Sequence, residues 1–396
     1  MSLRLGGTFI WLAYIFLADL DETLLAELII FDTIVNFFAM FSTIGVMQSY
    51  KLAGAGNGEN IPRLSTRTIS IMVTIVFLSG FLTYYQFFDA KLVIIQLLCV
   101  FLVGYCLLHS SFNYGARNFI LGATLDSSTR YLVLVLLLVT CDLLSTSYDI
   151  FYLYLGSCFA ISLFLGFSFR SATKGDIIQP NLAYFSMDTL NAIARYGYVI
   201  ASTLVLSVPN AAIIRIAIDS ATLILLPQQV YLGMLAGELA PNGTTKMRMA
   251  KYQKLAVEMS RFIPASISGL IVLYVLQRYS VLPEGISSLL SFSLIAAIFA
   301  VRCITILMGP AIQAALFTGS AQQLSLYSFG AVGVSILLLL ISGFAFGVKG
   351  VIISICFGII LRYWVAIHLL AAELSVSTYR LAFSTIKKNF DFKTSF

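Results

Sequence analysis

The sequence of 396 residues predicts an all-α polytopic membrane protein, with about twelve transmembrane helices in two six-helix lobes and both termini cytoplasmic. Charged residues make up only 11% of the chain and hydrophobic residues 59%, with a mean hydropathy of +0.94. A soluble domain carries about 25% charged residues, so this chain has too few to cover a surface that faces water. Long apolar stretches also recur along the whole chain, and its positive charges gather in alternate loops.

Twelve apolar stretches can be marked, most of them close to the length of about 20 residues that a helix needs to cross a bilayer. Helices are expected because a lone strand in lipid leaves its backbone groups unpaired, and the stretches lack the alternation of a membrane barrel. The first contains an apolar run of only 13 residues, 6–18, so either the chain starts further upstream or the bilayer thins there. The stretches cover residues 5–19, 23–49, 68–88, 92–113, 131–147, 150–169, 182–207, 210–236, 256–277, 286–316, 324–346 and 350–372.

The distribution of Lys and Arg predicts the orientation. Of the 24 basic residues, 17 lie in segments that are cytoplasmic if both termini are inside, among them Arg117 and Arg130 in the loop after the fourth stretch. The opposite loops contain three, which is a strong positive-inside asymmetry. Because the positive charge is scattered over separate loops and forms no single patch, nucleic acid is excluded as a partner.

The linker 171–180 is the predicted domain boundary, with one six-helix lobe over residues 1–175 and the other over 176–396. A short repeat supports this division, since the sequence IFDT at 30–33 is echoed by AIDS at 217–220, an offset of 187 residues. Six helices are an even number, so both lobes enter the membrane from the same side and the repeat is parallel.

Four arginines lie inside predicted spans of the second lobe. Each costs about 2.5–3.5 kcal/mol at the bilayer centre, so each should face protein or a water-filled cavity. In one interpretation the cations are neutralised locally, Arg215 by Asp219, Arg195 by Asp188, and Arg362 by reaching the interface. In the other they line a cationic cavity for an anionic substrate, because guanidinium groups match phosphate oxygens bidentately. The four are Arg195, Arg215, Arg302 and Arg362, and Arg302 has no acidic residue near it in sequence.

Asp32 and Asn36 share one face of the second stretch, at i and i+4. A carboxylate inside the membrane can carry a coupling proton, which makes this pair a candidate ion-coupling site. Alternatively, the two residues hold neighbouring helices together through hydrogen bonds. Asp219, at the position of Asp32 in the repeat, leaves the same alternatives open, and Asp188 is a further ion-coupling candidate.

Prolines interrupt three predicted spans of the second lobe, where they free carbonyl groups and permit kinks. They are Pro227, Pro264 and Pro310. The six cysteines lie in apolar stretches without a CxxC pair, and the two histidines are isolated, so neither a disulfide framework nor a metal site is expected. The sequence also lacks a P-loop, a GxSxG motif and an HExxH motif. We therefore expect a transporter with no catalytic residues and no cofactor.

Two segments resemble a known family. The stretch IFLADLDETLLAE at 15–27, continuing through 37–52, resembles the start of the Wzx-type polysaccharide flippases, and 211–239 with Pro227 resembles their eighth span. At the level of span lengths and loop charge the resemblance covers nearly the whole chain. The family's Arg-Leu-Leu-Gly pattern is replaced by Ala-Asp-Leu-Asp at 18–21, so no functional residue is carried over from that segment.

The resemblance implies the MATE-like fold of the multidrug/oligosaccharidyl-lipid/polysaccharide exporter superfamily, with two lobes around a central cleft. It implies a multi-pass protein of the bacterial inner membrane that moves an undecaprenyl-diphosphate-linked O-antigen or capsule oligosaccharide by ion-coupled alternating access. The implied partners are the bilayer, a polysaccharide polymerase and a chain-length regulator. Two alternatives stay open: a drug/cation antiporter of the same fold, which would favour acidic residues such as Asp32 and Glu27, and a membrane polymerase or ligase, which would need a large external loop.

Overall fold

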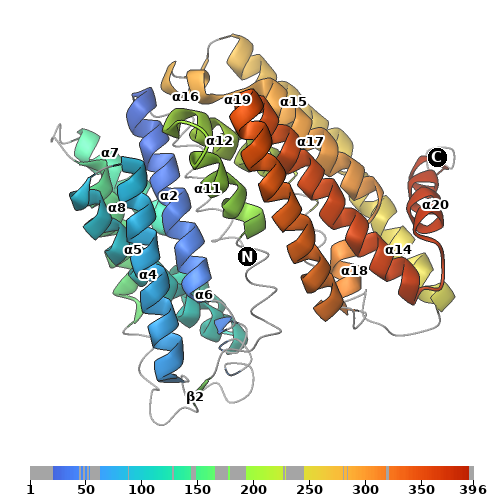
Figure 1. The fold of residues 1–396 in the computed structure, drawn as a ribbon, viewed down its shortest axis with the longest axis horizontal. Coiled ribbons are helices and arrows are strands. Elements are labelled where there is room, and N and C mark those ends of the chain that lie inside the picture. The colour runs from blue at the N-terminus through green and yellow to red at the C-terminus, as the bar shows by residue number, and fades with distance from the viewer. Residues whose placement is uncertain are drawn as a thin grey trace. The chain divides into compact units, whose positions relative to one another are not determined.

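A computed structural model shows that the chain is built almost entirely of helices (Figure 1). Its only strands among the described residues are β1 (Arg63–Leu64) and β2 (Ile177–Ile178), which pair in parallel. Contacts divide the chain into two compact units, Met1–Thr203 and Leu204–Phe396. The structure describes residues 21–43, 46–47, 50, 53, 63–87, 89–126, 129–143, 149–165, 177–178, 193–225, 228, 245–279, 281–282, 284–317 and 321–391.

In the first unit, α5 is the central helix, and α2, α4, α6 and α8 all pack against it. The hydrophobic core of this unit is formed largely by α2 and α5, whose inner faces are lined by aliphatic and aromatic side chains. The described helices of this unit are α2 (Glu22–Ser42), α4 (Thr66–Phe87), α5 (Ala90–Gly115), α6 (Phe119–Leu125), α7 (Thr129–Leu143), α8 (Ile150–Ser162), the π-helical turn η2 (Ile193–Gly197) and α11 (Tyr198–Thr203).

Aspartate residues set the start of three of these helices. The side chains of Asp21, Asp89 and Asp149 accept hydrogen bonds from backbone N–H groups two residues later and so cap α2, α5 and α8. Asp149 also forms an ion pair with Lys91, with 2.5 Å between Oδ2 and Nζ. Partial burial raises the pKa of Asp149, but the hydrogen bonds from Lys91 and Phe151 outweigh this effect and hold the pKa below its usual value.

The first unit extends further along the chain than the predicted first lobe. The segments η2 and α11 pack against α2, and Gln86 Nε2 donates a hydrogen bond to the carbonyl oxygen of Thr203 at 3.2 Å. Residues 193–203, predicted for the lobe 176–396, therefore pack with the helices of the first. Most of the linker 171–180 lies outside the described residues, so the boundary after residue 175 stays a prediction.

In the second unit, α17 is the central helix, and α12, α14, α15 and α19 pack around it. A separate core at one end of this unit joins α14, α18, α20 and the last turns of α19, with Tyr252, Leu255 and Leu381 buried inside it. The described helices are α12 (Val208–Ile224), α14 (Thr245–Ser260), α15 (Ile263–Arg278), α16 (Glu284–Leu289), α17 (Phe292–Leu307), α18 (Ala311–Phe317), α19 (Ala321–Glu373) and α20 (Thr378–Asp391).

Two of the prolines lie at the ends of helices, whereas kinks within helices were expected at these positions. Pro264 lies in the first turn of α15, and Pro310 separates α17 from α18. The apolar stretch 286–316, in which Pro310 was expected to permit a bend, is divided into the three helices α16, α17 and α18. Conversely, α19 is a helical hairpin that reverses at Gly347 (φ 61°), between the predicted stretches 324–346 and 350–372. Pro227 lies outside the described residues.

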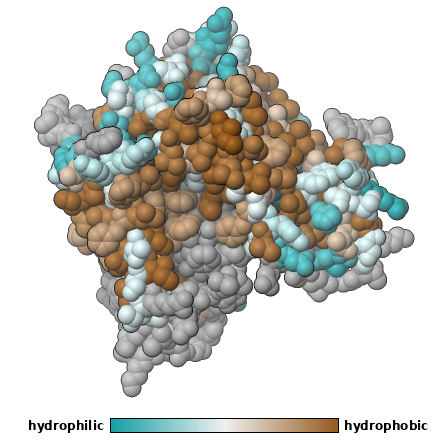
Figure 2. Space-filling view, viewed as in Figure 1, coloured by the Kyte–Doolittle hydropathy of each residue, from teal (hydrophilic) through white to brown (hydrophobic). Residues whose placement is uncertain are grey.

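The described helices are those of an integral membrane protein. Five helical segments are long and apolar enough to cross a bilayer, namely Glu22–Ser42, Thr68–Phe87, Ala90–Gly115, Met247–Arg278 (which joins α14 and α15) and Gln323–Glu373 (the hairpin α19). Three shorter apolar helices accompany them, at Thr129–Cys141, Ile150–Ser162 and Phe292–Leu307. Hydrophobic residues form a large part of the face drawn in Figure 2. Among the exposed apolar side chains, Phe81 and Phe344 are 72% and 88% exposed. The predicted all-α membrane fold is thus confirmed, while the count of twelve spans and the sides of the termini stay predictions.

Candidate functional site

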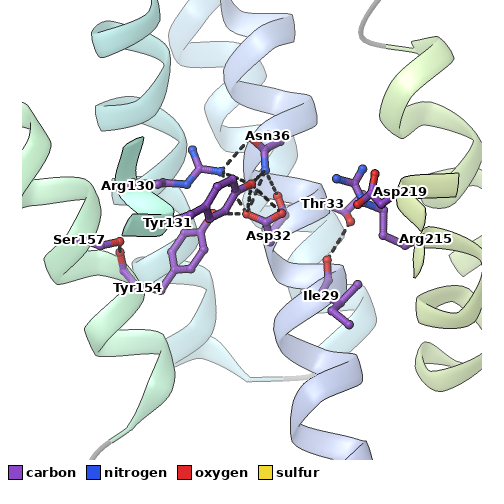
Figure 3. Close-up of polar contacts among 10 residues, drawn as sticks. All are labelled: Ile29, Asp32, Thr33, Asn36, Arg130, Tyr131, Tyr154, Ser157, Arg215 and Asp219. Carbon is purple, nitrogen blue, oxygen red and sulfur yellow. Dashed lines mark hydrogen bonds and ion pairs between the residues drawn. The ribbon is translucent and has the colours of Figure 1, made fainter. Parts of the chain in front are cut away.

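A buried polar cluster lies inside the first unit, on the face of α2 that carries Asp32 and Asn36 (Figure 3). The two residues are one helical turn apart, and Asn36 Nδ2 donates a hydrogen bond to Asp32 Oδ1 at 2.9 Å. Both side chains are almost completely buried among apolar residues of the unit. A carboxylate in such a place is costly unless it is paired and hydrogen-bonded.

Arg130, in the first turn of α7, supplies the opposite charge. Its Nη2 atom lies 3.0 Å from Asp32 Oδ1 and 2.8 Å from Asn36 Oδ1, and its side chain is only 1% exposed. Removal of either partner from a buried ion pair leaves an uncompensated charge. The pair therefore ties α7 to α2.

Two tyrosines complete the cluster. The hydroxyl groups of Tyr131 and Tyr154 donate to Asp32 Oδ1 at 2.9 and 2.6 Å, so this oxygen accepts from four donors in total. The guanidinium group of Arg130 also lies over both rings, 4.7 Å from the centroid of Tyr131 and 5.4 Å from that of Tyr154. Such cation–π contacts are strongest where water is excluded. Asp32 is thus held by residues of α7 and α8 as well as by its own helix.

Arg130 lies in the first turn of α7, so its predicted placement in a loop is wrong, while the predicted cytoplasmic side stays a prediction. The residue directly precedes the apolar stretch that begins at Tyr131, and α7 starts earlier than predicted, at Thr129. A shift of two residues is enough to move this guanidinium from water into the helix bundle. Its partner Asp32 is 98 residues away in sequence, so spacing within one helix could not reveal the pair. Of the two interpretations of Asp32 and Asn36, the geometry favours the one in which they hold helices together.

Arg130 also lines a small cavity inside the same unit. Its Nε and Nη1 atoms are buried and have no hydrogen-bond partner among the described residues. The carboxylate-bearing Asp126 is the other charged residue at this cavity. Apolar residues and thiols from α5, α6 and α8 form the rest of the wall, namely Val103, Cys106, Leu125, Cys158 and Ile161.

In the second unit, Arg215 and Asp219 form an ion pair within α12. Arg215 Nε lies 2.7 Å from Asp219 Oδ2, as expected for opposite charges at i and i+4. Arg215 is 7% exposed and Asp219 is 22% exposed, so the carboxylate keeps some access to its surroundings. The predicted local neutralisation of Arg215 is therefore present.

Two further arginines lie near this pair. Arg302 on α17 experiences the charges of both Arg362 on α19 and Asp219 on α12, and these helices pack together. The Nε atom of Arg302 is buried and has no hydrogen-bond partner among the described residues. Three arginines and one carboxylate thus lie near one another, and Asp219 forms its ion pair with Arg215.

The other two predicted site residues, Arg195 and Asp188, are not shown to contact either of these two groups of charged residues. The backbone of Arg195 lies in the π-helical turn η2 of the first unit, and its side chain is outside what the structure describes. Turns of this kind are frequent at functional sites. Asp188 lies outside the described residues, so its pairing with Arg195 stays a prediction.

Comparison with protein-family models, with curated proteins and with solved structures finds no match for this chain. Any assignment of function therefore depends on the chemistry of the two charged groups and on the membrane fold that contains them.

Proposed function

We propose that the protein is a flippase that moves undecaprenyl-diphosphate-linked oligosaccharides across the bacterial inner membrane by ion-coupled alternating access. The observation that supports this proposal is the group of arginines in the second unit, where Arg302 lies near Arg362 and the carboxylate close to it, Asp219, is already paired with Arg215. The alternative explanation, complete local neutralisation, accounts for Arg215 but leaves Arg302 without an acidic residue of its own.

A diphosphate fits this group of arginines. Cations inside a membrane helix are expensive, so they persist where they perform a task such as the binding of an anionic group. A guanidinium group presents a planar set of donors that matches phosphate oxygens, and two phosphates can engage more than one arginine. Arg302 is the first candidate to bind the diphosphate, with Arg215 and Arg362 as further cations of the same site, and Arg195 in the first unit stays a separate candidate.

The antiporter alternative receives less support from the first unit. A drug or cation antiporter needs a carboxylate that is free to exchange its counter-ion, whereas Asp32 is paired with Arg130 and accepts three further hydrogen bonds on the same oxygen. Asp219 is the more accessible carboxylate and is our first candidate for ion coupling. In the proposed pathway a polysaccharide polymerase and a chain-length regulator would act on the translocated product.

Substitution of Arg302 tests the proposal. In a bacterial strain that lacks its own O-antigen flippase and is complemented by this protein, we expect Arg302→Ala to abolish surface polysaccharide and Arg302→Lys to restore it only in part, because a point charge replaces a bidentate group. Arg278→Ala, which removes an exposed cation at the end of α15, is the matched control. Membrane fractions should contain equal amounts of all variants. Normal polysaccharide with Arg302→Ala would refute the cationic site.

A further inference from the structure

The helices α14 and α20 carry almost all of the net charge of the protein. The first contains four basic residues and one acidic residue, and the second contains three and one, so together they have a net charge of +5, while the whole chain has +6. Every other long helix is predominantly apolar. In the second unit, hydrophilic residues gather over α14 and α20 (Figure 2).

The contacts between the two helices leave most of these charges exposed, although Lys388 Nζ donates a hydrogen bond to Gln253 Oε1 at 3.3 Å. Gln253 Nε2 donates a hydrogen bond to Ser384 Oγ at 3.1 Å, and Ser260 Oγ donates to Asn389 Oδ1 at 3.3 Å. Apolar residues of α20 are buried in the core shared with α14 and α19. The inner faces of α14 and α20 therefore pack against each other. The exposed basic residues are Lys251, Lys254, Arg380, Lys387 and Lys388.

Few acidic residues are available to neutralise this surface. Arg248 pairs with Glu373 at 3.2 Å, and Lys254 pairs weakly with Glu258 at 3.8 Å. Arg380 and Lys387 on α20 take part in none of the ion pairs found among the described residues. An anionic partner would therefore meet exposed cations near both ends of α20.

Exposed aromatic rings accompany the cations on α20. Tyr379 and Phe383 are one turn apart and are 66% and 65% exposed. The ring of Tyr379 packs edge-on against Trp364 of α19, with 5.3 Å between centroids. Trp and Tyr concentrate at the level of lipid headgroups, where their rings meet both apolar and polar surroundings. A helix with aromatic and basic residues on its outer side is typical of segments that lie in this interface.

We propose that the surface formed by α14 and α20 binds anionic phospholipid headgroups. Tyr379 and Phe383 would enter the boundary between headgroups and acyl chains, and Arg380 and Lys387 would contact phosphates. A lipid is favoured over a soluble protein because α20 begins at Thr378, only a short turn after α19 ends at Glu373. Such a short connection keeps α20 beside the membrane. The inference requires only the membrane fold and is independent of the proposed transport function.

Trp364 provides a direct test, because the chain contains only one other tryptophan, Trp11. The full-length Trp11→Phe protein would be reconstituted in vesicles of equal parts phosphatidylcholine and phosphatidylglycerol, with one or the other lipid brominated. We expect brominated phosphatidylglycerol to quench Trp364 fluorescence more than brominated phosphatidylcholine. This excess should fall as salt is added, because salt screens exposed charges.

Two double variants separate a specific surface from general charge. Arg380→Gln with Lys387→Gln should lose most of the excess quenching, whereas Arg278→Gln with Lys349→Gln, which removes two exposed cations elsewhere in the same unit, should keep it. An unchanged emission maximum and helix content would show that both variants fold. Equal quenching by the two lipids in the starting protein, or equal losses in the two double variants, would overturn the proposal.

Discussion

At the scale of single residues, the Asp32–Arg130 pair connects helices that are distant in sequence. We expect Arg130→Met to destabilise the protein by about 3–5 kcal/mol, because it leaves the carboxylate of Asp32 buried without a counter-charge. The double variant Asp32→Leu with Arg130→Met should regain much of this loss, because both charges are then absent. Thermal unfolding of the two single variants and the double variant in detergent measures this coupling.

The control for this cycle is the exposed pair of Lys91 and Asp149, whose side chains are 47% and 35% exposed. Ion pairs in contact with water contribute little to the free energy of unfolding. Lys91→Met combined with Asp149→Leu should therefore show a coupling energy below about 1 kcal/mol. Equal coupling energies for the buried and the exposed pair would show that the cluster around Asp32 does not stabilise the packing of α7 against α2.

At the scale of elements, the break between α17 and α18 depends on one glycine. Gly309 has a φ of 94°, and a Cβ atom added there would lie 2.8 Å from Cζ of Tyr252. The hydroxyl of that tyrosine donates a hydrogen bond to the carbonyl oxygen of Met308 at 2.6 Å, which satisfies a carbonyl at the end of α17. The ring cannot move away without losing this bond.

We therefore expect Gly309→Ala to destabilise the protein by about 1–3 kcal/mol, through backbone strain and the clash with Tyr252. Gly330→Ala is the matched control, because Gly330 lies within α19 and an added Cβ would meet no atom within 4 Å. Alanine in a helix interior should instead be neutral or stabilise by up to about 1 kcal/mol. Thermal unfolding of the purified variants would contradict this account if both retained the same stability.

The sequence predicts the described helices best where bilayer thickness limits their length. The starts of α2, α4, α5 and α8 fall within two residues of the predicted stretches, because apolar length acts locally and because an aspartate caps three of these helices, α2, α5 and α8. Local patterns of this kind did not predict the short helices α6 and α16. They also did not predict that Arg130 is buried in the first turn of α7. These features depend on contacts between segments far apart in the chain, as the pair of Asp32 with Arg130 illustrates. By contrast, the ion pair of Arg215 with Asp219 lies within one helix, and spacing alone predicted it.

At the scale of the whole molecule, the charge of α14 and α20 supports one orientation in the membrane. Basic segments next to membrane helices stay on the cytoplasmic side, and α20 is the last described helix of the chain. Green fluorescent protein fused after residue 396 should therefore fluoresce in cells, whereas alkaline phosphatase at the same position should be inactive. Fusions in the loop before Glu284 should behave in the opposite way, because this loop and Arg278 are predicted to be periplasmic. Active phosphatase at the C-terminus would reverse the orientation, and with it the direction in which an oligosaccharide would have to move.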